Sequence, residues 1–332
     1  MKNSLKILSI LISVFILILT ISSCKTNNRK EVLNPTTKFS IEKIKNPTMI
    51  NSHKNHIYIS DFMDCKIYKY RLFNSKLEFI NKFLKKGTGP GEIGSYGQNR
   101  AFYVDIKNDK IFILDEIQSK LNIYDNNLNF IDEIRFQLRA NRIHFLNDDE
   151  ILISKLPLKN NKFLLKYNMN NKKYENLNLS IEKKKNMIKN VFASRISFAT
   201  DSNNLYIGYQ FKNTISKYSF NKNKIVKNIE LIPGKNSEIS SNMRENKVYT
   251  SRLRVYNNNI YILYNKFKNI GEALDKKDKL ELKSFLYVFD KNLNLKTKYG
   301  LKNKINDFTI SNEKLITITR DNIYIYNLKM NN

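Results

Sequence analysis

Short runs of β-branched and aromatic residues alternate with polar turns of Asn, Asp and Lys along the chain after residue 40. Runs and turns of this kind predict β-strands joined as hairpins. The 3.6-residue period of an amphipathic helix is scarce in the same region. The pattern therefore predicts an all-β protein.

The strand pattern repeats. Three copies begin at Ile57 (IYISDFMDCKIYKY), Ile111 (IFILDEIQSKLNIY) and Leu205 (LYIGYQFKNTISKY). In each copy an apolar residue is followed by a second after eight positions and by Tyr after eleven: Ile59, Ile67 and Tyr70; Ile113, Leu121 and Tyr124; Ile207, Ile215 and Tyr218. We expect hairpins whose two strands turn the same face inward.

Three weaker copies bring the total to six. They begin at Ile151, Ile260 and Leu315, and the fifth copy carries a long insertion at residues 265–283. Six copies between residues 41 and 330 average about 48 residues, close to the length of a four-stranded propeller blade. A ring of six blades leaves no long open edge. We therefore expect a six-bladed β-propeller over residues 41–332, with a strand from Phe39 to Met49 completing the last blade. A β-sandwich or barrel is the alternative.

The first residues resemble a bacterial lipoprotein signal. Lys2 and Lys6 precede a largely apolar stretch from Ile7 to Ile21, and Ser22-Ser23-Cys24 follows. A largely apolar stretch of fifteen residues suits a secretory signal and is short for a bilayer-spanning helix. We expect a signal peptide at residues 1–23, and a lipidated Cys24 followed by a flexible tether through residue 40. The alternative is an uncleaved anchor.

The net charge and the cysteines say less about the function than the strand pattern and the signal do. The formal net charge is +28, and it falls to +26 once Lys2 and Lys6 are removed. Such a field attracts anions, but the lysines are spread along the chain and accompany the Asn and Ile that A/T-rich codons favour. An exported protein does not meet nucleic acid, so we expect no nucleic-acid partner. Cys65 is expected to be a small buried residue, and no disulfide framework is implied.

Five of the nine glycines lie between residues 87 and 97, in GTGPGEIGSYG. The stretch matches GxGxxG, but no helix pattern follows it. It also has P-loop spacing, but Ser95-Tyr96 stands where Lys-Ser/Thr is required. Its place between two copies predicts a crossover between blades, where glycine permits sharp bends. The alternative is the rim of a ligand site, made of Lys86, Gly87, Gly89, Gly91, Glu92 and Tyr96, with Lys85 and Asn99 as companions.

This stretch carries a family resemblance. KKGTGPGEIG, followed by VDIKNDKIFILDEIQSKLNIYDNNLNFI, resembles bacterial six-bladed β-propeller lipoproteins of the TolB-like and NHL-like kind, in which G-x-G-P-G-E-F precedes a blade. Ile93 replaces the Phe of that pattern. The resemblance implies the propeller fold and no assigned activity. Asp61 and Asp115 recur in the first two copies, where the fourth has Tyr209, and we expect both carboxylates to cap hairpin amides.

Arginine recurs at the start of the strands expected to line the channel. The positions are Arg100, Arg142, Arg195, Arg252 and Arg254. The planar guanidinium suits carboxylates and phosphates, so a ring of these residues predicts an anion-binding channel mouth. The alternative is that exposed strand starts tolerate any basic residue.

Motifs of catalysis are missing from the sequence. It has three histidines and neither an HExxH pair, a Cys/His cluster nor a GxSxG elbow. We expect His144 to be a packing residue and the protein to need no metal or cofactor.

The sequence thus predicts a monomeric lipoprotein anchored outside the cytoplasm in the cell envelope. Its expected role is to bind an anionic small molecule or an envelope protein at the channel mouth without catalysis. The alternatives are a lactonase-like hydrolase and a scaffold for envelope assembly.

Overall fold

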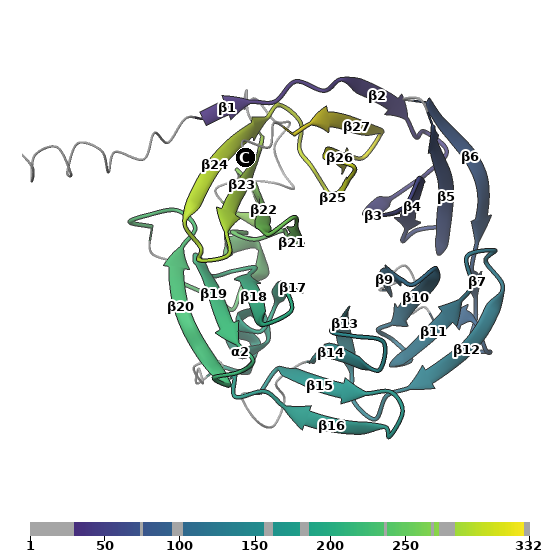
Figure 1. Ribbon diagram of the computed structural model, residues 1–332, viewed down its shortest axis with the longest axis horizontal. Helices are drawn as coiled ribbons and strands as arrows, with labels where there is room; N and C mark the ends of the chain where they lie inside the picture. Colours follow the sequence, from purple (N-terminus) through teal and green to yellow (C-terminus); the bar gives the residue numbers. More distant parts are fainter. Residues whose placement is uncertain are drawn as a thin grey trace, which may run out of the picture.

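Six sheets arranged in a ring confirm the predicted β-propeller (Figure 1). The computed structural model describes residues 30–73, 76–94, 102–155, 162–179, 186–235, 238–266, 269–271 and 283–328. Apart from two short strands at the start of the described chain, which lie at the outer edge of the ring, the strand that comes first in each blade lies innermost, beside the central axis. Later strands of the blade lie progressively further out (Figure 1).

The first three blades each have four antiparallel strands. Blade 1 contains β3 (Pro47–His53), β4 (His56–Asp61), β5 (Lys66–Phe73) and β6 (Lys76–Phe83). Blade 2 contains β9 (Phe102–Lys107), β10 (Lys110–Asp115), β11 (Lys120–Tyr124) and β12 (Phe130–Arg135). Blade 3 contains β13 (Ala140–Phe145), β14 (Glu150–Lys155), β15 (Leu164–Asn168) and β16 (Lys173–Asn176).

The last three blades follow the same plan, with two short helices and two short strands from the start of the described chain added to it. Blade 4 contains β17 (Ile196–Thr200), β18 (Asn204–Tyr209), β19 (Thr214–Ser219) and β20 (Lys224–Glu230). Blade 5 contains β21 (Arg252–Tyr256), β22 (Asn259–Asn265), β23 (Ser284–Asp290) and β24 (Leu295–Leu301). Blade 6 contains β25 (Asp307–Ser311), β26 (Lys314–Ile318) and β27 (Asn322–Asn327). Short helices α2 (Met187–Ala193) and η1 (Met243–Glu245) precede blades 4 and 5.

The start of the described chain closes the ring. Strand β2 (Thr37–Ser40) pairs antiparallel with β27 and supplies the fourth strand of blade 6. Strand β1 (Lys30–Val32) pairs in parallel with β24 of blade 5. The closing strand therefore lies earlier than the predicted Phe39–Met49, whose end belongs to β3. Residues of the expected tether are built into the sheets, so the propeller begins before residue 41.

Apolar residues fill the space between neighbouring blades. Ile59 packs with blade 6, whereas Ile67 packs with blade 2, and both side chains are fully buried. The prediction that such pairs share one face is wrong. Ile67 lies opposite Ser60 in the ladder, one position beyond Ile59, and so points to the other face. A blade is covered on both sides, and both of its faces are therefore apolar.

A ring of polar contacts joins the inner strands. Each inner strand has a partner on one side only, so its other edge carries unpaired backbone groups. Side chains from adjacent blades meet several of these groups. The contacts are Asn51 Nδ2 to the Val104 carbonyl at 3.0 Å, Thr200 N–H to His144 Nε2 at 3.3 Å, Leu253 N–H to Ser197 Oγ at 2.8 Å and Ile50 N–H to Asp307 Oδ2 at 3.1 Å.

Asp307 is the most heavily bonded member of this ring. Its buried carboxylate accepts two hydrogen bonds of 2.8 Å from Arg252, one from the Ile50 N–H and one from the Phe308 N–H. Arg254 donates to the carbonyls of Phe308 and Ile50. One carboxylate and two guanidiniums therefore connect blades 5, 6 and 1.

Replacing Asp307 by Ala should lower the free energy of unfolding by about 3–5 kcal/mol, because it leaves the buried Arg252 without its partner. Urea denaturation measures the change. The control is Asp149→Ala, since Asp149 is exposed and its carboxylate makes no hydrogen bond with the described residues. Equal losses in the two variants would contradict a central role for Asp307.

Candidate functional site

The glycine-rich stretch is a crossover from β6 to β9. Two short parallel strands, β7 (Lys85–Lys86) and β8 (Glu92–Ile93), hold its two ends together. Side chains of blade 2 hold this stretch in place, because Gln118 Nε2 and Lys120 Nζ donate hydrogen bonds to the carbonyls of Gly87 and Gly89 respectively. The described residues of this stretch line neither of the pockets discussed below.

Close contacts with neighbouring side chains explain why residues 87 and 91 are glycine. Glu92 folds back so that its Oε2 accepts from the Gly89 N–H at 2.9 Å, and a Cβ on Gly87 would lie 2.0 Å from that oxygen. Gly91 has a left-handed φ of +68°, and a Cβ there would lie 2.9 Å from the Phe130 ring. These contacts support a structural crossover, and within the described part they keep Glu92 occupied inside the loop.

Two predicted caps are confirmed. Asp61 Oδ1 accepts from the N–H groups of Met63 and Asp64. Asp115 Oδ1 accepts from those of Ile117 and Gln118, and its Oδ2 from Gly94 N–H at 2.6 Å. Cys65 is fully buried, as predicted, but lies in the turn before β5.

The predicted arginines separate into two groups. Arg142 and Arg195 lie together at the start of the inner strands of blades 3 and 4, whereas Arg252 and Arg254 lie on β21 further around the ring. Arg100 lies outside the described residues, as do Tyr96, Asn99 and Cys24.

Arg142 and Arg195 line a cavity of about 400 Å³, the mouth pocket. It lies where blades 2, 3 and 4 meet, and its other lining residues are Glu116, Arg139, Asn141, Val191, Ile196 and Gln210. The guanidinium carbon of Arg142 lies 6.0 Å from the centre of the Tyr103 ring, and that of Arg195 lies 5.7 Å from the Phe192 ring. Aromatic faces thus hold both side chains in place.

The mouth pocket has more positive charge than its one carboxyl group can neutralise. Among the described residues, neither Arg142 nor Arg195 forms a hydrogen bond or ion pair with a carboxylate. Burial, and then the nearby charge of Arg252, lowers the pKa of Arg142 to about 10. Burial raises the pKa of Glu116 to about 7, although Arg142, Arg195 and Arg139 each oppose the shift. Among the described lining residues, three arginines therefore stand beside one carboxyl group.

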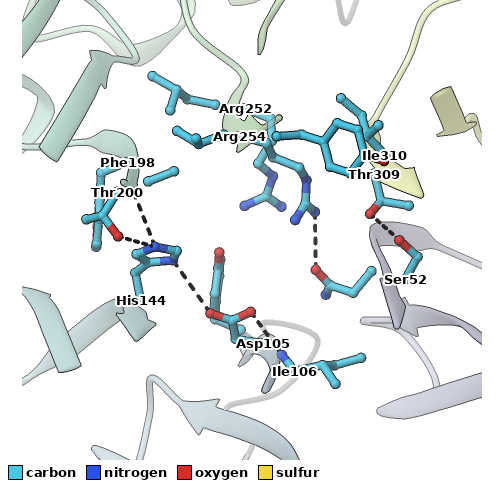
Figure 2. A pocket seen from close by; sticks show the side chains of 16 residues that line it. Ser52, Asp105, Ile106, His144, Phe198, Thr200, Arg252, Arg254, Thr309 and Ile310 are labelled. Carbon is cyan, nitrogen blue, oxygen red and sulfur yellow. Dashed lines mark hydrogen bonds and ion pairs between the residues drawn. The ribbon is translucent and has the colours of Figure 1, made fainter. Parts of the chain in front are cut away.

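Arg252 and Arg254 line a second cavity of about 230 Å³, the channel pocket (Figure 2). It is lined by residues from all six inner strands, mostly from their second halves: Asn51, Ser52, Tyr103, Asp105, Ile106, His144, Phe198, Ala199, Thr200, Arg252, Leu253, Arg254, Val255, Tyr256, Thr309 and Ile310. Figure 2 shows both arginine side chains reaching from β21 into this space.

His144 makes polar contacts with the inner strands of both neighbouring blades, whereas the sequence predicted a packing residue (Figure 2). Its Nε2 lies 3.0 Å from Thr200 Oγ1 and accepts from the Thr200 N–H, which places the ring proton on Nδ1. That atom lies 3.8 Å from Asp105 Oδ2. Burial lowers the pKa of His144 and raises the pKa of Asp105. His144 thus caps the edge of β17, and this contact fully uses the lone pair that a base needs.

The described part of the chain offers neither a candidate metal site nor a candidate membrane-spanning helix. Its His, Cys, Asp and Glu side chains form no group of three or more that could hold a metal ion. Its helices include none long and apolar enough to cross a membrane.

Comparison with known families settles the family. A family model described as TolB-like 6-blade propeller-like matches residues 23–313. The chain belongs to this family. Membership confirms the resemblance seen in the glycine-rich stretch and extends it over nearly the whole chain. No curated protein matches the chain.

Two solved structures show the same architecture as this TolB-like chain. A member of the DUF4221 family from Bacteroides vulgatus superposes with a TM-score of 0.60 at 10% identity, covering 90% of this chain and 98% of the other. A predicted exported protein from Bacteroides fragilis gives a TM-score of 0.52 at 17% identity, covering 87% and 83%. At these identities the likeness concerns the fold.

Sequence reasoning missed four polar residues of the mouth pocket, namely Asn141, which is the second residue of β13, and three residues outside the inner strands. Glu116 lies in the turn after β10, Arg139 just before β13 and Gln210 just after β18. All three lie next to the ends of strands on the side where the inner strands begin. Polar residues at these positions were therefore a usable signal in the sequence. The prediction missed them because it considered recurring charge only on the inner strands.

The carboxyl group of Glu116 should titrate near pH 7, as carbon-13 NMR of its side chain would show. Replacing Arg142 by Gln should move the midpoint above 7, because Arg142 is the strongest of the charges that favour the ionised form. Glu116→Gln identifies the signal, and Arg71→Gln, an exposed arginine of blade 1 that does not line the mouth pocket, serves as the control. An unchanged midpoint in Arg142→Gln would show that the two groups do not share one pocket.

Proposed function

We propose that this TolB-like protein is a lipid-anchored, extracytoplasmic binding protein that takes an anionic small molecule in the mouth pocket without catalysis. The observation that carries the proposal is the pair Arg142 and Arg195. Both guanidiniums face one cavity, and neither bonds to a carboxylate among the described residues.

The form of the mouth pocket suits a small ligand. Its volume of about 400 Å³ lies in the range of roughly 300–1,000 Å³ that is usual for small-molecule sites. Guanidinium groups bind carboxylates and phosphates through two parallel hydrogen bonds. Asn141 and Gln210 add amide groups that orient a ligand, and Val191 and Ile196 add apolar walls.

Arginine is favoured over the surrounding lysine background by its fixed geometry. The chain contains far more lysine than arginine, yet the described residues that line the mouth pocket include three arginines and no lysine. A guanidinium presents donors in a rigid plane, whereas an ammonium acts as a point charge. This choice supports recognition of a planar or tetrahedral oxyanion over general attraction by the field of the protein.

The location outside the cytoplasm rests on separate support. The sequence from Lys2 to Cys24 has the order of a lipoprotein signal, and one of the two similar structures belongs to a predicted exported protein. A diacylated cysteine anchors a protein stably. The propeller would then present its mouth pocket to solutes of the cell envelope.

Isothermal titration of the full chain with citrate and with glucuronate tests the proposal. We expect Arg142→Gln and Arg195→Gln each to weaken binding by about 10- to 100-fold, as the loss of a charge-assisted hydrogen bond predicts. Binding should also weaken as salt is added.

The control is Arg71→Gln, an exposed arginine of blade 1, which should bind as the unaltered chain does. Binding that is equally strong in the two mouth-pocket variants would overturn the assignment of the site. Absence of binding by either acid at millimolar concentration would overturn the small-anion proposal and leave an envelope protein as the partner to test.

A further inference from the structure

One buried arginine donor of the channel pocket has no partner among the described residues. Arg252 is only 7% exposed, and its Nε and Nη2 are both bonded to Asp307. Its third nitrogen, Nη1, is buried and makes no hydrogen bond with the part of the chain that the structure describes. A buried donor without a partner is destabilising, so a group that accepts this bond stabilises the fold.

The surroundings of Arg252 favour a negatively charged acceptor over water. Asp307 is the carboxylate closest to both Arg252 and Arg254, and its Oδ2 lies 3.6 Å from Arg254 Nη2. One negative charge therefore serves two guanidiniums. Arg142 adds a third positive charge, because its guanidinium and that of Arg252 lie 6.0 and 5.5 Å from the centre of the same Tyr103 ring.

The remaining acid of the channel does not restore the balance. Asp105 lies toward His144, at 3.8 Å, and its Oδ1 accepts from the Ile106 N–H (Figure 2). Burial raises the pKa of Asp105, and its carboxylate lies on the side of the channel pocket that holds His144. The channel thus keeps a surplus of buried positive charge, and such charges require a counter-ion or a paired group.

We infer that the channel pocket binds one small oxyanion, of the phosphate, sulfate or carboxylate class, through Arg252 Nη1. Arg252 and Arg254 supply the charge, and Figure 2 shows both reaching into the space. The hydroxyl groups of Ser52 and Thr309, which lie 2.7 Å apart, bring further donors to the same pocket. The cavity of about 230 Å³ admits a small anion and excludes a large ligand.

This site is distinct from the mouth pocket. The two cavities share no lining residue, and they lie toward opposite ends of the inner strands. The Tyr103 ring lines the channel pocket, and Arg142, which lines the mouth pocket, contacts the same ring. An anion in the channel would weaken the repulsion that Arg252 exerts on Arg142.

Crystals of the full chain soaked in sodium selenate test the inference without any substitution. We expect an anomalous selenium peak in the channel pocket, with one selenate oxygen within about 3.2 Å of Arg252 Nη1. Ordered water alone at that nitrogen would overturn the inference. A selenate in the mouth pocket but none in the channel would do so while leaving the proposed function standing.

Sulfate titration tests the same site in solution. The background is Arg195→Gln, which disables the mouth pocket and should keep sulfate binding in the channel. Adding Arg252→Lys, which keeps one positive charge beside Asp307 but removes Nη1, should weaken sulfate binding at least about tenfold. Arg71→Lys is the matched control. Unchanged affinity in a folded Arg252→Lys protein would overturn the inference, and if this variant does not fold, the selenate crystals decide.

Discussion

The free edges of the six innermost strands are the constraint on which the rest of this propeller depends. Backbone groups on those edges face the axis with no neighbouring strand to bond, and buried polar groups must be paired. The chain meets several of them with side chains from the next blade, such as Ser197 for the Leu253 N–H and Asp307 for the Ile50 N–H. Polar residues that look scattered in the sequence are thus parts of one ring that fixes how the blades meet.

This ring also decides which arginines are left to bind a ligand. The ion pair of Arg252 with Asp307 and the bonds of Arg254 to backbone carbonyls hold blades 5, 6 and 1 together. At the junction of blades 2, 3 and 4, Arg142 and Arg195 bond to no carboxylate among the described residues. Arginine therefore joins blades on one side of the channel and lines the mouth pocket on the other.

Local sequence patterns predicted what local contacts determine. The hairpin repeat predicted six blades, because each strand pair lies within about a dozen residues, and Asp61 and Asp115 cap amides two and three residues away. The prediction about faces was wrong because alternation was judged as if one face were covered, whereas blades cover each other on both sides. The insertion in the fifth copy was found because the flanking strands β22 and β23 both fit the repeat.

Contacts between distant residues could not be predicted in the same way. Arg252 and Asp307 are 55 residues apart, and nothing in the sequence links them until the blades are placed side by side. For the same reason the five arginines looked like one ring, although the structure separates those it describes into two pockets. The glycines had a clear local signal for bends, but the return of Glu92 onto Gly89 depends on how blade 2 supports the loop.

Hydrogen exchange of individual backbone amides tests the central claim most directly, because it reports whether side chains protect the inner edges. The amides of Ile50 and Leu253 should exchange as slowly as those within the strand ladders, and Ser197→Ala should speed exchange at Leu253 while leaving Ile50 unchanged. Exchange of both amides at the rate of exposed turns in the unaltered chain would show that the channel is open to water and that no polar ring closes it.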